Sequence, residues 1–246
     1  MKGQKAVAEA TKLLTEDDFA VSATALMVKD YIKALQLLDN ARIDRILDLG
    51  CGFGGVTKVA ANFFSAKEAY GVDINPDRLK VAESRGVRTT RADINMDKLP
   101  FPPDYFDLVI SNGVIEHLMF YDNLITESYR VLKKGGHLLL TLPNLANYIQ
   151  RISLILGYQP SDVDISKEIY AGTIFYAGKP AEGHIHSATI NAMKQLLEYY
   201  NFTVLAVRKG DPRMIGTFRK WALLFKVIGY LCPTSLARRM IVIARK

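Results

Sequence analysis

The chain has 246 residues, of which 49% are hydrophobic, so it can form one α/β domain with additions or two small domains. Its net charge is +7, and its 2 cysteines, Cys51 and Cys232, are too few for a disulfide framework and indicate a reducing compartment. The amino-terminal residues lack the apolar core of a signal peptide, and no uncharged stretch reaches about 18 residues. We therefore expect a cytoplasmic protein without a membrane span.

Taken in chain order, apolar segments of strand length alternate with segments of helical periodicity. After a helix over 17–40, strands are expected at 45–49, 69–73, 87–93, 106–111 and 137–142, with helices at 56–65, 76–84 and 122–132 between them. The last of these helices would be closed by the cations and glycines of Lys133-Lys-Gly-Gly136. A helix at 189–200 and strands at 202–209 and 240–244 follow. This order predicts an α/β fold with a doubly wound, mostly parallel sheet of seven strands.

The positive charge belongs to the last part of the chain. Residues 208–246 carry ten Lys/Arg and one acid, whereas residues 1–207 have a net charge of −2. Within this part, Phe218–Leu231 combines basic and aromatic residues, and a basic helix with aromatic anchors can lie in a lipid interface. Its nearly continuous apolar character also fits packing on the sheet, with the basic residues on an exposed rim. We favour packing, with peripheral membrane contact as the alternative.

The most informative segment is Ile46-Leu-Asp-Leu-Gly-Cys-Gly-Phe-Gly-Gly55, in which an apolar run ends in an acid and glycines follow at alternate positions. It predicts a buried strand that turns sharply into a helix and holds a cofactor, because glycine tolerates positive φ and lets the backbone approach a ligand. The loop also fits the G-x-G-x-x-G fingerprint of dinucleotide-binding proteins. Tyr129-Arg-Val-Leu-Lys133 has the Tyr-x-x-x-Lys spacing of short-chain dehydrogenases, although Tyr129 would lie on the flank of the sheet. An NAD-binding oxidoreductase is thus the alternative from another class.

Five motifs in order carry a resemblance to a known family. They are the loop Asp48–Gly54, the strand end Tyr70-Gly-Val-Asp73-Ile-Asn-Pro76, the triplet Ala92-Asp93-Ile94, and the segments Leu99–Leu118 and Arg130–Leu140. Over about residues 40–144 the chain closely resembles class I S-adenosylmethionine-dependent methyltransferases, in particular the type 11/type 12 methyltransferase domain. The resemblance implies a Rossmann-like methyltransferase fold, S-adenosylmethionine as the cofactor and a methyl-transfer activity.

The resemblance also implies which residues contact the cofactor. Asp73 would accept hydrogen bonds from both ribose hydroxyls, since a carboxylate has two acceptor oxygens. Asp93 would accept a hydrogen bond from the adenine amino group, and Ile94 would pack on the ring. Capping of strand ends is the alternative role for both acids. The expected cofactor-binding residues are Asp48, Gly50, Cys51, Gly52, Gly54, Asp73, Ile74, Asp93, Ile94, Ser111 and Asn112, with Cys51 as a small filler within the loop.

The nature of the acceptor is indicated mainly by motifs that the chain lacks. The strand 106–111 leads into Ser111-Asn-Gly-Val114 rather than the Asn/Asp-Pro-Pro-aromatic sequence used for amide or adenine nitrogens, and no Pro-Cys follows a strand. Methyl transfer needs mainly alignment, plus a base if the nucleophile is a hydroxyl. The candidate catalytic residues are Glu116, His117, His184 and His186, all expected at the carboxyl edge of the sheet. His184 and His186 have no third ligand near them in the sequence, so no metal is predicted.

We expect a single methyltransferase domain over 1–246. It would comprise the helix at 17–40, a cofactor-binding core at 41–143, a lid or substrate insert at 144–187, and the last helices and strands at 188–246. The insert contains a predicted helix at 145–156 and a long irregular stretch, which is typical of a binding loop. The expected activity is methylation of a small-molecule or carrier-linked acceptor (a glycan or a lipid), preferably at oxygen. An RNA or membrane-lipid acceptor recruited by the basic C-terminal part is the rival within this class.

Overall fold

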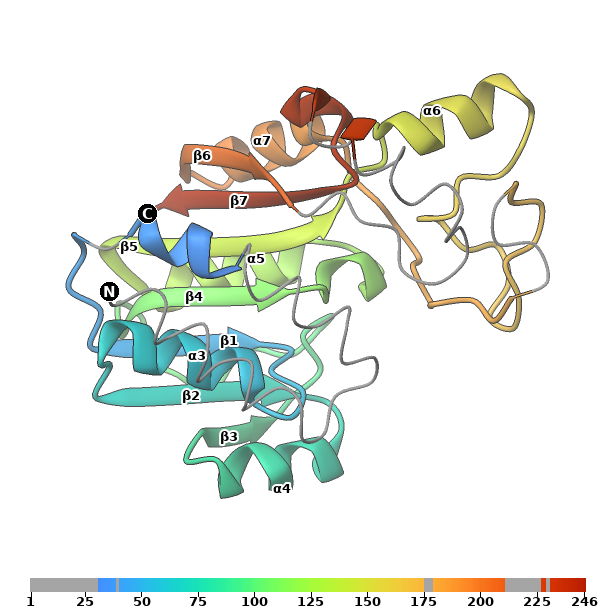
Figure 1. Ribbon diagram of the computed structural model, residues 1–246. Coiled ribbons are helices and arrows are strands. Elements are labelled where there is room, and N and C mark those ends of the chain that lie inside the picture. Colours follow the sequence, from blue (N-terminus) through green and yellow to red (C-terminus); the bar gives the residue numbers. More distant parts are fainter. Residues whose placement is uncertain (1–30, 39, 175–178, 211–226, 229–230) are drawn as a thin grey trace.

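The computed structural model describes residues 31–38, 40–174, 179–210, 227–228 and 231–246. Within them, one sheet of seven strands has the order β3-β2-β1-β4-β5-β7-β6 (Figure 1). The strands are β1 (Arg45–Leu49), β2 (Glu68–Asp73), β3 (Arg88–Arg91), β4 (Phe106–Asn112), β5 (Leu132–Pro143), β6 (Thr203–Lys209) and β7 (Arg239–Arg245). The predicted seven-stranded sheet is confirmed.

The strand directions identify the edge at which ligands bind. Strands β1 to β5 run parallel to their neighbours, whereas β7 runs antiparallel between β5 and β6. The strand order reverses at β1, which pairs with β2 on one side and β4 on the other. In open α/β sheets, the crevice beyond the carboxyl ends at such a reversal is where ligands bind. The glycine loop starts in this crevice because β1 ends at Leu49.

Helices cover both faces of the sheet. They are α3 (Gly55–Phe64), α4 (Pro76–Ser84), α5 (Asp122–Val131), α6 (Tyr148–Ile155) and α7 (Ile190–Tyr199), and residues 31–36 are also helical. In Figure 1, α3 and the helix at 31–36 lie on one face, and α5 and α7 on the other. Alternate strand residues follow this division: Leu47 belongs to the same core cluster as Leu124 and Leu197, whereas the adjacent Ile46 belongs to the cluster of Leu35 and Val59. Both faces of the sheet are therefore core, as a parallel sheet requires.

The boundary between α5 and β5 differs from the prediction. Lys133-Lys-Gly-Gly136 does not close the helix but forms the start of β5. Leu132 pairs with Phe106 of β4, and Lys133 Nζ donates a hydrogen bond to Asp107 Oδ1 at 2.5 Å. Pairing with β4 thus outweighs the helix-capping propensity of these residues.

Two predicted elements lie largely outside the described residues. Residues 31–36 of the predicted helix at 17–40 are helical, and residues 17–30 are outside the described part. Of the basic segment Phe218–Leu231, only 227–228 and Leu231 are described, so neither packing nor an interfacial position is tested. Among the residues that the structure describes, no helix is long and apolar enough to cross a membrane.

The insert 144–187 lies beyond the carboxyl edge of the sheet (Figure 1). It begins with α6 and continues along an irregular path, with 175–178 outside the described residues. Its first residue, Asn144, is 0% exposed, and its Nδ2 donates hydrogen bonds to the carbonyl oxygens of Ser235 and Ala237 at 3.0 and 2.9 Å. A buried polar side chain thus anchors the insert beside the crevice.

Candidate active site

The glycine loop after β1 turns the chain into α3. Gly50, Gly52 and Gly54 have φ of 79°, 51° and 76°, as the sequence predicted. A Cβ at Gly50 would lie 2.2 Å from Val114 Cγ2, and one at Gly54 would lie 2.9 Å from Ala82 Cβ. At Gly52 nothing lies within 4 Å of the Cβ position. Gly50 and Gly54 therefore allow close packing, while Gly52 presents bare backbone to open space.

A pocket of about 650 Å³ lies beyond this loop and the carboxyl ends of β1, β2 and β4. His117 forms part of its wall. The predicted cofactor residues that line it are Gly50, Gly52, Asp73, Ile74, Asp93, Ile94 and Asn112. Residues predicted from separate motifs therefore meet in one cavity at the switch point of the sheet.

Asp73 ends β2 and presents its carboxylate to the pocket. Its Oδ2 accepts a hydrogen bond from the backbone N–H of Gly52, and its Oδ1 accepts one from Asn75, both at 2.9 Å. Each carboxylate oxygen can accept a second hydrogen bond, so each can also bind one hydroxyl of a ribose. Asp73 thus fits the role that the resemblance implies, and it positions the glycine loop at the same time.

Asp93 and Ile94 form the wall that follows β3. Asp93 Oδ1 accepts hydrogen bonds from Asn95 N and Nδ2 at 2.9 and 3.0 Å, and Asp93 N donates to Asp97 Oδ2 at 2.7 Å. Ile94 is 7% exposed, whereas Ile74, which directly follows β2, is 58% exposed. A carboxylate and apolar side chains on a loop held by its own polar groups suit an adenine ring and its amino group.

Four of the predicted cofactor residues support the loop instead of lining the pocket. Asp48 is 1% exposed and accepts a hydrogen bond from Thr57 Oγ1 of α3 at 2.5 Å. Ser111 Oγ donates to the carbonyl oxygen of Leu49 at 3.0 Å. Cys51 is buried against Gly71, and burial raises the pKa of its thiol. Gly54 is the N-cap of α3. These residues therefore stabilise the conformation of the cofactor loop.

Asp48→Asn is expected to stabilise the protein above about pH 7. Burial raises the pKa of the Asp48 carboxyl to about 7, and repulsion from Asp73 adds to the rise. Because this pKa is raised on folding, the contribution of Asp48 to stability is fully present below about pH 4 and is lost as the pH rises through about 7. Asparagine keeps the acceptor for Thr57 without the buried charge.

Denaturant unfolding at about pH 5 and about pH 8 tests this expectation. The variant should exceed the wild type in free energy of unfolding by roughly 2–4 kcal/mol at the higher pH and by less at the lower. The same difference at both pH values would contradict it.

The turn after β4 carries two of the predicted catalytic residues, of which His117 lines the pocket. Glu116 and His117 belong to the 3-10 turn η1 (Ile115–His117). His117 Nδ1 lies 2.9 Å from the carbonyl oxygen of Gly183. Since a carbonyl oxygen only accepts, Nδ1 of the neutral ring carries the proton and Nε2 carries the lone pair. Glu116 is 1% exposed.

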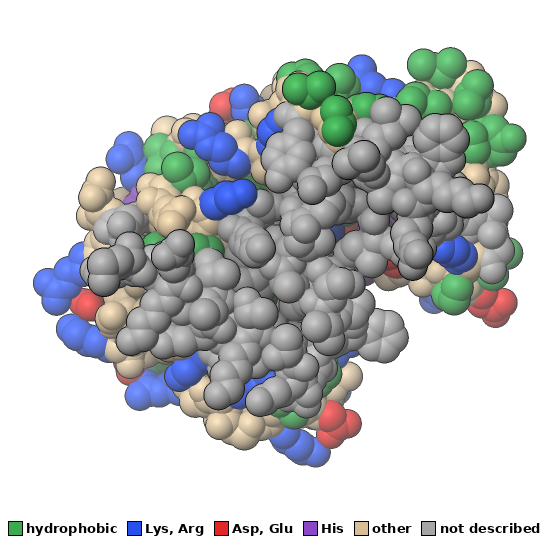
Figure 2. All heavy atoms as spheres, in the orientation of Figure 1, with side chains coloured by type: hydrophobic (Ala, Val, Ile, Leu, Met, Phe, Trp, Pro, Cys, Tyr) green, Lys and Arg blue, Asp and Glu red, His purple; other side chains and the backbone are tan. Residues whose placement is uncertain are grey.

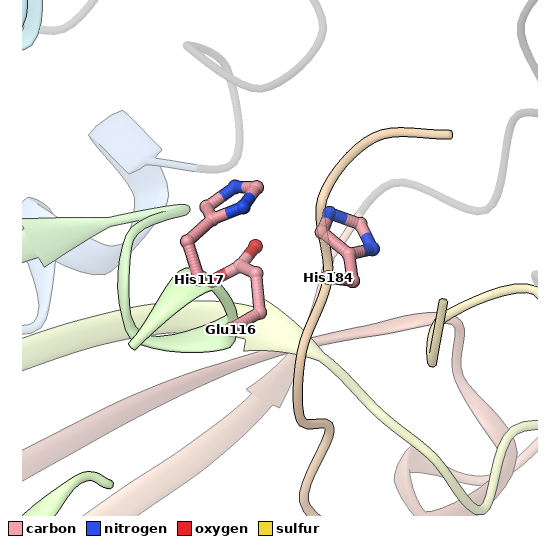
Figure 3. Close-up of side chains that lie close together, drawn as sticks. All are labelled: Glu116, His117 and His184. Carbon is pink, nitrogen blue, oxygen red and sulfur yellow. The ribbon is translucent and has the colours of Figure 1, made fainter. Parts of the chain in front are cut away.

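His184 comes from the insert and faces this turn from the opposite side (Figure 3). Its ring centroid lies 5.0 Å from that of His117, and the residue is 7% exposed. The backbone N–H of Ile185 donates to the carbonyl oxygen of Glu116 at 2.9 Å, which holds the two segments together. The structure thus brings Glu116, His117 and His184 into one cluster.

His186 lies apart from this cluster. Its side chain is exposed, and its ring stacks on Phe120 with 6.4 Å between the centroids. The two histidines of Gly183-His-Ile-His186 therefore do not act as a pair, because His184 is buried next to His117 whereas His186 is exposed beside Phe120.

The fold and the pocket can be compared with known proteins. Residues 47–140 match the family of methyltransferase domains. They form a methyltransferase domain. The matched range includes the glycine loop, Asp73, Asp93 and the turn with Glu116 and His117.

Curated relatives share the methyltransferase domain and differ in their acceptors. A malonyl-[acyl-carrier protein] O-methyltransferase of Paenibacillus sp. is 30% identical over 104 residues, which are 39% of this chain and 38% of that protein. A ubiquinone/menaquinone biosynthesis C-methyltransferase of Burkholderia mallei is 33% identical over 101 residues, 39% of this chain and 42% of that protein. The matched part is about two fifths of the length of these relatives.

Solved structures share the fold over most of the chain. An S-adenosylmethionine-dependent methyltransferase from Mesorhizobium loti has a TM-score of 0.59 at 20% identity, covering 87% of this chain and 97% of its own. One from Archaeoglobus fulgidus has a TM-score of 0.59 at 18% identity, covering 89% and 93%. The Rossmann-like methyltransferase fold that the motifs implied is therefore confirmed.

Tyr129 and Lys133, the two residues that suggested an NAD-binding oxidoreductase, lie away from the pocket of the methyltransferase domain. The ring of Tyr129 packs edge-on against Phe202 of the segment after α7, with 5.2 Å between the centroids. Lys133 is bonded to Asp107 at the start of β4. Neither residue lines the cofactor pocket, so neither can act on a ligand bound there.

Some pocket residues were not identified from the sequence. Arg78 and Asn95 follow the recognised motifs by a few residues, and Val114 is the neighbour that requires Gly50 to be glycine. Glu182 comes from the insert, far from the methyltransferase motifs. The only available signal was the cluster Glu182-Gly-His184, which predicted a position near the carboxyl edge and no specific contact.

Proposed function

We propose that the protein transfers the methyl group of S-adenosylmethionine to a hydroxyl oxygen of a small-molecule or carrier-linked acceptor. His117 carries this proposal, because it lines the cofactor pocket and its Nδ1 is fixed by Gly183 so that Nε2 keeps its lone pair. The bound cofactor supplies a methyl carbon that is already activated by the sulfonium charge. A hydroxyl, in contrast, gains nucleophilicity only when a group nearby draws off its proton. The cluster of Glu116, His117 and His184 is the candidate for that role.

The charges of the pocket favour a neutral acceptor over RNA. Among the described lining residues, Asp73, Asp93 and Glu182 are acidic and Arg78 is basic. Such a wall attracts the cationic sulfonium and repels a polyanion. A nucleic-acid acceptor would depend on the basic segment Phe218–Leu231, most of which lies outside the described residues.

Apolar surface on the insert favours a lipid-bearing carrier for the acceptor. Figure 2 shows hydrophobic side chains gathered over α6. Ile155 is 82% exposed, and Ile152, Leu154 and Leu156 are exposed by 46%, 59% and 56%. Exposed apolar patches of this kind mark binding surfaces. The curated O-methyltransferase relative acts on an acceptor held by a carrier protein, which supports carrier linkage in general.

Labelled S-adenosylmethionine tests the proposed reaction. Cells with and without the gene are first compared for metabolites and lipid-linked glycans that differ by one methyl group. The unmethylated compound is then incubated with the purified full chain and methyl-labelled cofactor, free or in vesicles. We expect a methoxy product, identified by its NMR signal. Label on carbon or nitrogen would contradict the hydroxyl acceptor, and failure to bind S-adenosylmethionine would contradict methyl transfer itself.

A further inference from the structure

Three side chains beside the pocket, of which His117 forms part of its wall, converge on one point. A carboxylate oxygen of Glu116 and one ring nitrogen each of His117 and His184 all lie within 4.8 Å of one another. In Figure 3, Glu116 and His117 extend from the η1 turn and His184 faces them from the insert. Two imidazoles and one carboxylate are the donor set of catalytic zinc sites and of other transition-metal sites.

We propose that Glu116, His117 and His184 bind a divalent transition-metal ion, with Zn²⁺ as the ion that this donor set fits best. Ligands bound to one Zn²⁺ at about 2.1 Å in tetrahedral geometry lie about 3.4 Å apart. The three side chains therefore have to draw together by roughly 1 Å, which side-chain rotation can provide. Three protein ligands leave the fourth position open for water or for an acceptor oxygen.

The hydrogen bonds around the cluster leave the required lone pairs available. His117 donates through Nδ1 to Gly183, so its Nε2 can act as a ligand. His184 Nε2 lies 3.5 Å from Glu182 Oε2, which favours the proton on Nε2. Its Nδ1 is buried and has no hydrogen-bond partner among the described residues. Both rings thus have the arrangement of metal-binding histidines, in which the second nitrogen donates to a carbonyl or a carboxylate.

Glu116 is a buried acid whose charge the described structure compensates only in part. Its Oε2 is buried without a hydrogen-bond partner in the described part of the chain. Its Oε1 lies 3.5 Å from Arg239 Nη2, and no hydrogen bond joins them. Burying a carboxylate with an unsatisfied oxygen is costly unless a cation or donor completes its coordination. A metal ion at Oε2 would do so while Arg239 stays beside Oε1.

The backbone around the cluster is held in place before any ion binds. The carbonyl oxygen of Glu116 accepts hydrogen bonds from the N–H groups of Ile185 and His186 at 2.9 and 3.3 Å. Asp164 Oδ2 accepts from the N–H groups of Gly183 and His184 at 2.7 and 2.9 Å. The two halves of the site are thus preorganised, which lowers the cost of binding.

The ion would also explain how the acceptor loses its proton, a consequence that rests on the proposed function. His117 lines the pocket, so an acceptor hydroxyl that binds there would lie next to one ligand of the ion. A metal ion lowers the pKa of a bound hydroxyl or water by several units, and the released proton passes to solvent. The methyl–sulfur bond then breaks as the oxygen–methyl bond forms, and the electron pair stays on sulfur.

Titration with Zn²⁺ alone tests the site directly. Untagged protein, stripped with a chelator, should bind one equivalent by calorimetry. Glu116→Gln and His184→Ala should each weaken binding at least tenfold. His186→Ala should bind as the wild type does, because His186 lies in the same segment but points away from the cluster. Mg²⁺ should not bind here, since it prefers oxygen ligands. Equal Zn²⁺ affinity in the wild type and His184→Ala, or no binding to the wild type, would overturn the proposal.

Thermal unfolding gives a second readout and separates the two proposals. Zn²⁺ should raise the Tm of the wild type and of His186→Ala but not that of Glu116→Gln. Zn²⁺ binding without a methoxy product would contradict the hydroxyl acceptor and leave the metal site in place. A methoxy product from protein that neither binds Zn²⁺ nor responds to a chelator would overturn the metal site and leave the proposed function.

Discussion

Replacing His117 by alanine is expected to lower the turnover number for a hydroxyl acceptor by roughly 10²–10⁴-fold. The variant loses the ring nitrogen in the pocket wall that would help to remove the hydroxyl proton, either as the base or as a ligand of the proposed ion. Asp73 and the glycine loop remain, so the affinity for S-adenosylmethionine should change little. Initial rates at saturating cofactor, together with calorimetric titration of S-adenosylmethionine, separate these two effects.

His137→Gln is the matched control for this experiment. His137 pairs with Leu108 in the sheet, so it lies before the carboxyl ends of β4 and β5 and away from the pocket. Its replacement should leave turnover unchanged. Full activity of His117→Ala at all pH values between about 6 and 9 would remove histidine from the proposed reaction.

The second large effect is expected at Asp73. Asp73→Ala removes the acceptors for two ribose hydroxyls, and two charge-assisted hydrogen bonds are worth on the order of 2–4 kcal/mol in total. The dissociation constant for S-adenosylmethionine should therefore rise roughly 30- to 1,000-fold. Calorimetry with S-adenosylmethionine and with its demethylated product measures the change, and NAD should bind neither protein.

Asp77→Ala is the control for a lost carboxylate near the same loop. Asp77 is exposed in the first turn of α4 and pairs with Lys80 at 2.8 Å. Its loss should not alter cofactor affinity. An Asp73→Ala variant that keeps wild-type affinity would show that Asp73 only holds Gly52 and Asn75 in place, which is the capping role left open by the sequence.

The cofactor half of the site could be predicted from the sequence because its residues belong to local motifs. Each motif follows a strand, and parallel strands bring their carboxyl ends to one edge. The topology of the sheet is therefore sufficient to predict that Asp73, Asp93 and Gly52 lie close together. Side-chain direction was less predictable. Asp48 and Ser111 lie near the carboxyl ends of β1 and β4, but their side chains bond to Thr57 of α3 and to the carbonyl oxygen of Leu49 instead of lining the pocket.

The acceptor half could not be predicted in the same way. His184 reaches Glu116 through an irregular insert, whose path depends on contacts such as that of Asp164 with the Gly183 and His184 N–H groups. The hydrophobic periodicity of the sequence does not indicate such contacts. The start of β5 was predicted wrongly for a related reason. The charge of Lys133 suits the end of a helix, but its contact with Asp107 on the neighbouring β4 places it in a strand.

The position of β7 between β5 and β6 determines when the sheet can be completed during synthesis. Both neighbours pair with Arg239–Arg245, so the edges of β5 and β6 that face β7 stay unpaired until these residues have left the ribosome. Arg239, the first residue of β7, also lies beside Glu116. A nascent chain that stops before residue 239 would therefore carry the cofactor loop and its acids, but neither the complete sheet nor the cation that lies beside the buried Glu116.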